Sequence, residues 1–513
     1  MAAEASPRPH SDLERDVLEA FWAYERALKA NDVDALDEAF SAGESALRSD
    51  GTTVTVGASE IARMRRVRAV IPRRAVTSVH VVPSSADGAL VMASLRSPQG
   101  MRGTQTQLWE RRDDRWRVVA AHVTSTQAPF DRSVWRVLGA PLVAGASEGE
   151  CAGLRVAVKD LFAVAGMTIG AGIPERAALA PRESAHAWAV DRLLAAGADV
   201  TGIAQTDQFA YGLAGQNGRF GTPLNVAQPD RVPGGSTSGG ATAVALGWAD
   251  LALGTDTAGS LRVPAAYQRL WGIRTTHGMV PRDGVLPLAP SFDAVGALAR
   301  DVDTLQRAIR ELNPSASRQA PGGWMTVPAL TRLADDDARS LVNQIARHTG
   351  ARECEWGIDL DAAFTAFRTV QAAEAWHAHG AWITDHPGVL SDDVAERFAL
   401  ASTVADADAH RAYAVIDEVR ATLRDQLGDR ILVLPTTSTQ PPPLDASDEE
   451  MNAHRARTLR LNCIASLAGL PAVALPVGHD GTSVCLVGPA GSDLALLEVA
   501  GDLHASFSGQ GES

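Results

Sequence analysis

The chain has 513 residues, of which 45% are hydrophobic and 21% are charged, as is ordinary for a globular protein. Its 47 basic and 61 acidic residues give a net charge of −14, which argues against nucleic-acid partners that depend on phosphate neutralisation. No apolar run approaches the ~18 residues of a membrane span. Residues 1–13 also lack the pattern of a signal peptide. We therefore expect a cytoplasmic protein without a nucleic-acid or membrane partner.

Cysteine and histidine spacing predicts no metal site. The four cysteines contain no C-x-x-C pair, and the thirteen histidines contain no H-E-x-x-H motif. His377 and His379 lie two residues apart on a predicted helix, so their side chains point to different faces. We expect reduced thiols, no metal and no other cofactor.

The first part of the chain is predicted to form a separate α+β domain at residues 10–128, after a flexible N-terminus at residues 1–9. Apolar residues recur at helical spacing from Leu13 to Leu28. Shorter helices and then an antiparallel meander follow. The predicted elements are helices at Val33–Phe40 and Glu60–Val67 and strands at Val76–Val82, Ala89–Leu95, Gly103–Glu110 and Trp116–Thr124.

This domain resembles the NTF2-like (SnoaL-like) cone fold, and within it the AtzH-like domain found beside amidases in cyanuric-acid catabolism. The resemblance covers most of residues 10–126 and rests on the helix around Phe21 and on the closing strand Asp114–Val119. Such cones usually enclose a pocket, and the resemblance places Tyr24 and Arg48 at its mouth. A non-catalytic dimerisation or docking module is the favoured interpretation, and catalysis on the product of the second domain is the alternative.

Residues 129–150 contain two prolines and a run of small residues, and we predict a linker there. Residues 151–508 are predicted to form an α/β domain with a central mixed, partly parallel sheet flanked by helices, because short apolar strands alternate with Ala-rich helices. Strands are expected at Leu154–Val158, Asp199–Ala204, Leu251–Gly254, Ile431–Leu434 and Ala472–Val477, and helices at Ser184–Ala196, Thr242–Gly247 and Leu461–Leu470.

Lysine is rare in this chain. Of the 47 basic residues only two are lysines, Lys29 and Lys159. An arginine keeps its proton in a protein, whereas a buried lysine can become a neutral amine and act as a base. Lys29 lies on a predicted helix surface, so Lys159 is the candidate for such a role.

Two glycine- and serine-rich loops carry the clearest chemical signal. Pro233–Gly240 reads PGGSTSGG, and Leu253–Arg262 reads LGTDTAGSLR. A Walker A loop is excluded because no Gly-Lys-Ser/Thr ends either loop, and the G-x-S-x-G elbow is excluded because Thr237 occupies its centre. Consecutive N–H groups from Thr257 to Ser260 can converge on one oxygen, which suits acyl transfer. A serine there needs a base, and a neutral lysine is the available one.

Together these motifs resemble the amidase signature family of Ser–cis-Ser–Lys hydrolases over nearly all of residues 150–500. The match consists of G-G-S-x-x-G at residues 234–239 and G-T-D-x-x-G-S-x-R-x-P-A at residues 254–265. The segments at residues 274–278 and 291–296 are most similar to the indole-3-acetamide hydrolase and carboxybiuret hydrolase subgroups.

The resemblance implies a role for each of three residues. Ser260 is the nucleophile, Ser236 is the cis-serine and Lys159 is the base. Lys159 is also the residue to which the rarity of lysine in this chain points. Ser238 competes with Ser236, because the register across the Ser-Thr-Ser run rests on spacing alone. The expected oxyanion donors, together with Ser260 itself, are Thr257, Ala258 and Gly259.

Further positions are expected around the substrate. We assign Gly235, Gln216 and Arg269 to substrate binding, and we prefer a structural ion pair between Asp256 and Arg262. The chain departs from the family pattern at several positions. Arg269 stands where the family usually has glycine, and it can reshape the pocket wall or bind an anion. The other departures are Thr237, Gln268 and Thr275.

The sequence therefore predicts an amidohydrolase that cleaves a C–N bond of a small amide, carbamate or ureido compound through an acyl-enzyme on Ser260. The AtzH-like domain favours ureido acids such as carboxybiuret, whereas the subgroup motifs favour aryl-acetamides, and this choice stays open. Two alternatives are a partner-dependent glutaminase-type amidotransferase subunit and a non-catalytic binding or scaffolding homologue. We expect a homodimer, because closed symmetric dimers are the commonest oligomers.

Overall fold

The computed structural model describes residues 12–49, 54–66, 74–96, 102–124, 130–317, 321–477 and 482–508. It divides into two compact units, Met1–Pro129 and Phe130–Ser513. The expected flexible N-terminus at residues 1–9 lies outside the described part. None of the described helices is long and apolar enough to cross a membrane.

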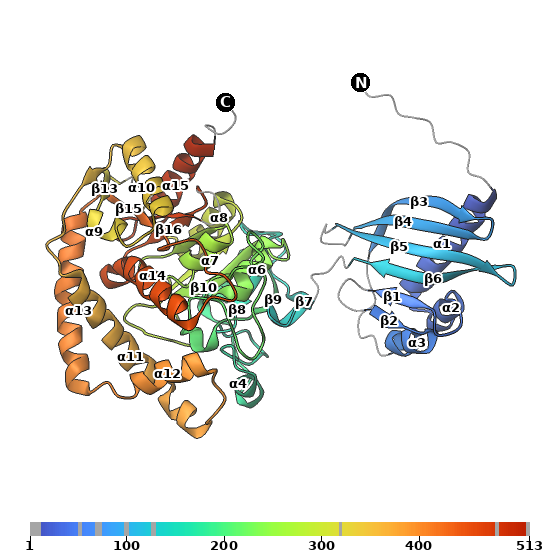
Figure 1. Ribbon diagram of the computed structural model, residues 1–513, viewed down its shortest axis with the longest axis horizontal. Helices are drawn as coiled ribbons and strands as arrows, with labels where there is room; N and C mark the ends of the chain where they lie inside the picture. The colour runs from blue at the N-terminus through green and yellow to red at the C-terminus, as the bar shows by residue number, and fades with distance from the viewer. Residues whose placement is uncertain are drawn as a thin grey trace. The chain divides into compact units, whose positions relative to one another are not determined.

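The described residues of the first unit form three helices and one six-stranded sheet (Figure 1). Its elements are α1 (Asp12–Ala30), α2 (Val33–Glu38), β1 (Leu47–Ser49), β2 (Val54–Val56), α3 (Ala58–Arg66), β3 (Ala75–Ser85), β4 (Gly88–Arg96), β5 (Arg102–Arg112) and β6 (Arg115–Val123). The strand order is β2-β1-β6-β5-β4-β3, and β1 pairs with β6 in parallel. Helix α1 buries Val17, Phe21 and Leu28 in the core of this unit. The predicted meander is present, and the structure adds β1 and β2, which at three residues each are too short to show an alternating pattern.

The second unit is built on one eleven-stranded sheet. Its strands are β7 (Trp135–Val143), β8 (Arg155–Lys159), β9 (Asp199–Ala204), β10 (Leu251–Asp256), β11 (Trp271–Arg274), β12 (Ala294–Ala299), β13 (Trp324–Thr326), β14 (Arg352–Glu353), β15 (Ile431–Pro435), β16 (Ala472–Leu475) and β17 (Val484–Val487). Their order is β14-β13-β15-β17-β16-β11-β12-β10-β8-β9-β7. Strand β8 pairs in parallel with both β9 and β10, whereas β12 is antiparallel to its neighbours. The sheet is therefore mixed, as the sequence predicts.

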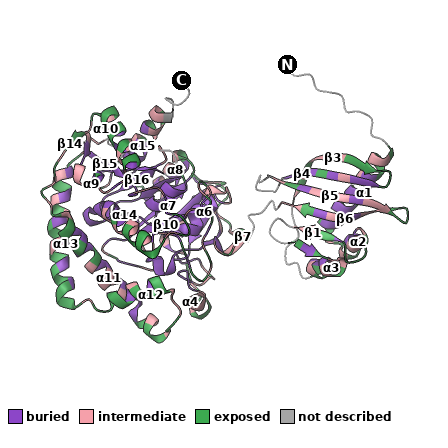
Figure 2. Ribbon diagram, in the orientation of Figure 1, coloured by how far each residue is buried: buried purple, intermediate pink, exposed green. Residues whose placement is uncertain are grey.

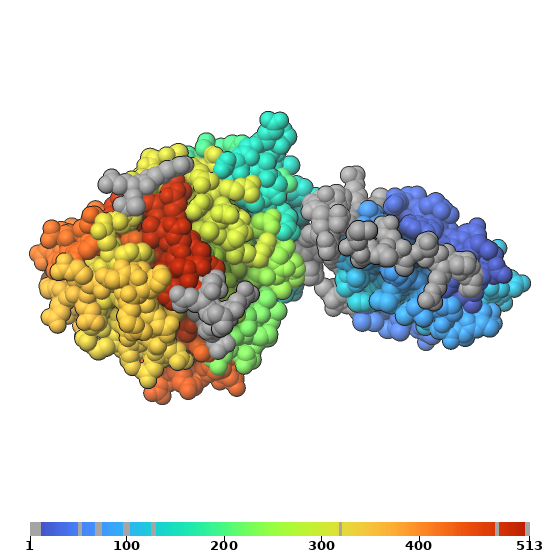
Figure 3. Space-filling model, turned by 90° about the horizontal axis from the view of Figure 1, so that it is seen from above, coloured from blue at the N-terminus to red at the C-terminus, as the bar shows by residue number. Residues whose placement is uncertain are grey.

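Helices surround this sheet, and Figure 2 shows that burial is greatest at the central elements and least on the outer helices. The helices are α4 (Pro174–Leu179), α5 (Trp188–Ala195), α6 (Ser238–Ala245), α7 (Arg262–Tyr267), α8 (Val302–Leu312), α9 (Pro328–Thr331), α10 (Asp336–Thr349), α11 (Leu360–Asp385), α12 (Asp392–Ala401), α13 (Asp406–Leu427), α14 (Asp448–Ala468) and α15 (Asp493–Ser508). Helix α15 packs against α8 at the surface (Figure 3).

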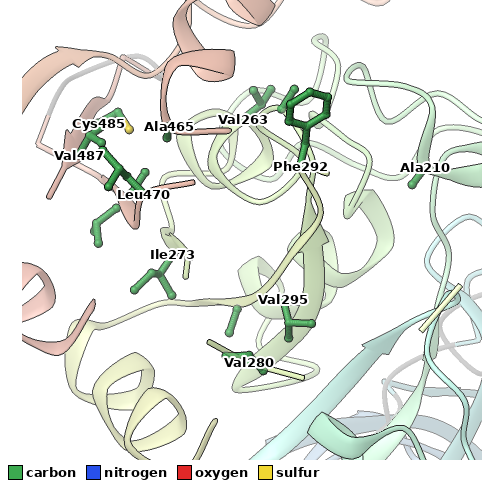
Figure 4. Close-up of a cluster of buried hydrophobic side chains, with 14 of the residues drawn as sticks. Ala210, Val263, Ile273, Val280, Phe292, Val295, Ala465, Leu470, Cys485 and Val487 are labelled. Carbon is green, nitrogen blue, oxygen red and sulfur yellow. The ribbon is translucent and has the colours of Figure 1, made fainter. Parts of the chain in front are cut away.

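Helices α7 and α14 are attached to the sheet by apolar side chains. Val263 of α7 and Ala465 of α14 belong to the same buried cluster as side chains from three strands (Figure 4). The strand residues are Ile273 of β11, Val295 of β12 and Val487 of β17. This packing holds both helices beside the loops described below.

Four predicted boundaries need correction, one of which is the helix predicted from Leu461, because α14 already begins at Asp448 with a Ser447 capping box. The linker interpretation of residues 129–150 is wrong over Trp135–Val143, which forms β7 at the sheet edge and pairs with β9. An edge strand tolerates proline, so Pro141 does not prevent it. Helix α6 begins at Ser238 and not at Thr242, and α5 begins at Trp188 and not at Ser184.

Gly296 in β12 offers a test of this packing. A Cβ atom there would lie 2.0 Å from the carbonyl oxygen of Ile273 on β11, so the strands would have to separate. We expect Gly296→Ala to lower the apparent unfolding free energy by about 1–3 kcal/mol in a urea titration of the full chain. Gly501→Ala on α15 is the control. Its Cβ would approach no atom within 3.5 Å, so this change should be neutral or stabilising, and equal effects of the two variants would contradict the assignment.

Candidate active site

The candidate site lies at one edge of the central sheet. Strands β9, β8 and β10 are parallel neighbours, so their carboxyl ends lie at the same edge. Ligand sites of α/β sheets typically lie beyond such strand ends. Lys159 ends β8, Asp256 ends β10, and Asp207 follows β9 by three residues.

Lys159 is buried and contacts two hydroxyl groups. Its Nζ donates to Ser236 Oγ at 2.8 Å and to Thr255 Oγ1 at 3.1 Å. Burial lowers the pKa of Lys159 to about 7, although the negative charges of nearby aspartates, Asp207 first, oppose this shift. A substantial fraction of this lysine is therefore a neutral amine at neutral pH.

Ser236 follows a cis peptide bond, Gly235–Ser236. Its carbonyl oxygen accepts from Thr206 Oγ1 at 2.8 Å and from the Asp207 N–H at 3.3 Å. The competing serine, Ser238, instead has its Oγ 3.4 Å from Asp207 Oδ1. Of these two serine hydroxyls, Ser236 Oγ is the one that contacts Lys159.

Ser260 lies in the turn between β10 and α7 and is buried. Its carbonyl oxygen accepts from the Thr237 N–H at 3.2 Å, which ties the two glycine-rich loops together. Among the described residues, no hydrogen bond joins the hydroxyls of Ser236 and Ser260. Such bonds are often long in ligand-free sites and shorten when substrate binds.

Asp256 shapes the turn that carries Ser260. Its carboxylate accepts from the N–H groups of Gly259 at 2.8 Å and Leu261 at 3.2 Å. Arg262 Nε and Nη2 donate to the same carboxylate at 3.0 and 2.8 Å. Burial alone would raise the pKa of Asp256, but the charges of Arg262 and Arg274 hold this pKa well below its usual range. The expected Asp256–Arg262 ion pair is confirmed.

The expected oxyanion donors need one revision. The Gly259 N–H already donates to Asp256, so this group does not point at a substrate oxygen. The N–H groups of Thr257, Ala258 and Ser260 have no hydrogen-bond partner within the described residues. Gly259 still has a structural reason to be glycine, because its φ is 116° and a Cβ would lie 2.9 Å from Asn462 Cγ.

Sequence reasoning missed Asp207. Burial raises its pKa to about 6, and it accepts from the Gly215 N–H at 3.2 Å. A Cβ on Gly212 or Gly235 would lie 2.2 or 2.5 Å from Asp207 Oδ2, so both glycines pack directly on this carboxylate. The sequence shows only that Asp207 follows the predicted strand Asp199–Ala204, and it is the pairing of β9 with β8 that brings this carboxylate to the site.

The expected substrate-binding residues are not gathered at one place. Gly235 packs on Asp207 beside the cis-serine, whereas Gln216 and Arg269 are exposed. The assignment of Arg269 to substrate binding stays a prediction. Its φ is 55°, a left-handed conformation that explains the family's usual glycine at this position. Gln268 links the end of α7 to α6, because its Nε2 donates to Thr242 Oγ1 at 2.8 Å.

Tyr24 lies in the first unit, in the wall of a hollow of about 520 Å³ that Trp109 also lines. Arg48 is half-buried on β1 and is not among the lining residues. Deeper in this unit, Arg74 Nη2 donates to Glu25 Oε1 at 2.7 Å. Tyr24 therefore lines this hollow and Arg48 does not, and their assignment to the mouth of a ligand pocket stays a prediction.

Possible metal ligands do not cluster in the described part of the chain. No group of three or more His, Cys, Asp or Glu side chains there is arranged to hold a metal ion. His379 is buried and its Nε2 lies 2.7 Å from the carbonyl oxygen of Pro287, whereas His377 is exposed.

Comparison with known proteins agrees with the geometry. The amidase family profile matches residues 140–323, and the AtzH-like profile matches residues 9–129. Amidase 1 of Arabidopsis thaliana is 32% identical over 422 residues, which cover 74% of this chain and 99% of that protein. The chain belongs to the amidase family. The 1-carboxybiuret hydrolase subunit AtzE of Pseudomonas sp. is 33% identical to this amidase over 358 residues, covering 63% and 76% of the two chains.

A similar solved structure comes from a vestigial protein complex connected with the origins of an s-triazine catabolic enzyme. It has a TM-score of 0.64 and 30% identity, over 70% of this chain and 85% of that one. The two matched profiles confirm the amidase-signature fold and the AtzH-like domain. This protein is therefore an enzyme that hydrolyses C–N bonds of amides, and the comparisons do not favour the alternative functions.

Asp256 provides a stability test of the turn that carries Ser260. Asp256→Asn would leave Arg262 and Arg274 buried without a counter-charge, since both guanidinium groups contact this residue. We expect the apparent unfolding free energy to fall by about 3–5 kcal/mol in a urea titration. Asp408→Asn removes the exposed pair with Arg411 and should cost less than about 1 kcal/mol. Unchanged stability of Asp256→Asn would refute a structural role for the buried pair.

Proposed function

We propose that this amidase works through an acyl-enzyme on Ser260, with Ser236 as proton carrier and Lys159 as general base. The observation that carries the proposal is the 2.8 Å contact between Lys159 Nζ and Ser236 Oγ. It joins a buried lysine, whose pKa burial lowers to about 7, to the hydroxyl beside the nucleophile turn. No histidine is needed in this arrangement, because the neutral amine supplies the base.

The reaction begins with two proton transfers. Neutral Lys159 takes the proton of Ser236 as Ser236 takes that of Ser260, and Ser260 Oγ bonds to the amide carbonyl carbon. The C–N bond then breaks, Ser236 passes a proton to the leaving nitrogen, and Lys159 returns one to Ser236. Water cleaves the resulting ester by the same route, which releases the acid and restores Ser260.

Backbone N–H groups stabilise the negative charge on the tetrahedral intermediate. We assign this role to Thr257, Ala258 and Ser260, whose N–H groups are unoccupied within the described part, and not to Gly259. Loss of one such donor typically raises the barrier by roughly 3 kcal/mol. The Asp256 network keeps the turn in shape before substrate arrives, so these donors need little rearrangement.

The proposed substrate is a small amide, carbamate or ureido compound that releases ammonia or an amine. The similarity to Amidase 1 and to a 1-carboxybiuret hydrolase subunit supports this range. A partner-dependent glutaminase-type subunit is less favoured, because the similarity to a protein named as an amidase extends over 99% of that protein.

We further propose that the AtzH-like unit is a docking or dimerisation module and that the enzyme acts as a cytoplasmic homodimer. A similar solved structure that belongs to a protein complex supports an assembly role for this kind of chain. The Tyr24 hollow also permits an active first unit, and turnover by the Tyr24→Phe variant would address that possibility.

The nucleophile and its partners can be tested on a panel of aryl amides, aryl carbamates and ureido acids by measuring ammonia or amine release. We expect Ser260→Ala, Ser236→Ala and Lys159→Met each to lower kcat by at least roughly 10³-fold, because each removes one member of a proton-transfer chain. Ser238→Ala is the matched control, and it should retain activity within about tenfold. Near-wild-type turnover in any of the first three variants would refute that residue's role.

The base can be tested by pH dependence. Since the neutral amine is the active form, kcat/KM should rise with pH and level off above about pH 7, where Lys159 loses its proton. Asp207→Asn removes a negative charge that raises the pKa of Lys159. The acidic limb of the kcat/KM profile of this variant should therefore move to lower pH. A limb that stayed in place, or moved upward, would exclude this coupling.

A further inference from the structure

One face of helix α14 connects the nucleophile turn with Arg455. Asn462 lies against Gly259, since a Cβ on that glycine would meet Asn462 Cγ at 2.9 Å. Arg455, Thr458 and Asn462 follow the i, i+3, i+7 spacing of one helix face. At 1.5 Å of rise per residue, Arg455 lies about 10 Å along the helix from Asn462. The Arg455 position is thus separated from the Ser260 turn by the length of a small substrate.

Neighbouring contacts bring the part of α14 that carries Arg455 to the loop Pro233–Gly240, which contains Ser236 and is called the cis-serine loop below. The His454 ring is hydrogen bonded to the Tyr267 hydroxyl, and a Cβ on Gly234 would lie 2.9 Å from the Tyr267 ring. On the other side, the Gly235 N–H donates to the Leu213 carbonyl oxygen at 2.8 Å, which places the segment after Tyr211 along this loop.

Three guanidinium groups place positive charge near the Tyr211 side chain. Positive charges of Arg455, Arg397 and Arg368 all influence the Tyr211 hydroxyl, with Arg455 the strongest of the three. Arg397 has partners, because Nη2 pairs with Asp393 at 2.6 Å and Nη1 donates to the Tyr211 carbonyl oxygen at 2.7 Å. This leaves an excess of positive charge in a chain whose net charge is −14.

Arg455 itself has no hydrogen-bond or ion-pair partner among the described residues, and its Nε is buried. Burial and the charge of Arg397 lower the pKa of Arg455 to about 9, so it remains a cation at neutral pH. The residue as a whole is half-buried, and an unpaired cation loses favourable solvation to the extent that it is buried. A ligand that carries negative charge would remove this cost.

We propose that Arg455 binds a carboxylate of the substrate, so that the preferred substrates are anionic small amides or ureido compounds and not apolar aryl-acetamides. The planar guanidinium matches a carboxylate with two parallel hydrogen bonds. The spacing along α14 requires a carboxylate separated from the scissile carbonyl by a chain of several atoms. This inference rests on the proposed function, and it assigns to Arg455 the anion contact that the sequence suggested for Arg269.

The test compares matched substrates that differ in one charge: the monoamides of succinic, glutaric and adipic acid, and their neutral methyl esters. The wild-type enzyme should prefer at least one carboxylate over its ester in kcat/KM. Arg455→Met should lower kcat/KM for that carboxylate by roughly 10- to 100-fold, mainly through KM, because a hydrogen bond between charged groups is lost. The same variant should change kcat/KM for the ester by less than about twofold.

Arg457→Met is the control, since Arg457 is exposed on the same helix. Equal losses on ester and carboxylate, or a wild-type preference for the esters, would overturn the carboxylate site while leaving amide hydrolysis intact.

The two proposals are separated by calorimetry with adipate, a dicarboxylate that needs no turnover. Adipate should bind the Ser260→Ala variant, and adding Arg455→Met should weaken that binding at least tenfold. Binding that Arg455→Met leaves unchanged, or no binding at all, would refute the inference whatever the activity results.

Discussion

The buried charge network around Asp256 is the interaction on which the active site depends. One carboxylate holds the Gly259 and Leu261 N–H groups and two guanidinium groups, so it fixes the turn after β10 and the start of α7 together. The Gly259 N–H is turned inward to Asp256, and in the proposed mechanism the neighbouring N–H groups are the ones that face a substrate oxygen. The internal ion pair would then hold those donors in place for acyl transfer.

Lysine chemistry at this site results from competition between burial and charge. Burial of Lys159 favours the neutral amine, while Asp207, Asp256 and Asp293 favour the ammonium form, and the balance leaves its pKa at about 7. Asp256 is already neutralised by arginines, so Asp207 is the aspartate through which this balance is best adjusted. Its contacts with Gly212, Gly215 and Gly235 explain why glycines border the cis-serine loop.

The distribution of arginine shows two uses of one residue type. Arg262 and Arg274 are paired with Asp256 and belong to the framework. Arg455 has no such partner among the described residues, and this is the basis on which we propose that it recognises an anion. Arg269 replaces a glycine of the family pattern, and its positive φ accounts for that glycine by the backbone conformation.

Much of this protein could be predicted from sequence because the decisive signals are local. Strands β8, β9 and β10 and the two glycine-rich loops follow from short patterns in the chain. The rarity of lysine points to Lys159, and the family resemblance points to Ser236. Other features could not be predicted from the sequence. They are the strand β7 in the segment predicted as a linker, the hydrogen bond of the Gly259 N–H to Asp256, and the roles of Asp207 and Arg455. They depend on which parallel strands become neighbours and on what α14 packs against, and those contacts join residues that are distant in the chain. The sequence by itself determined which side chains can carry the chemistry. Tertiary structure decided their protonation and charge partners, because burial and through-space charge set both.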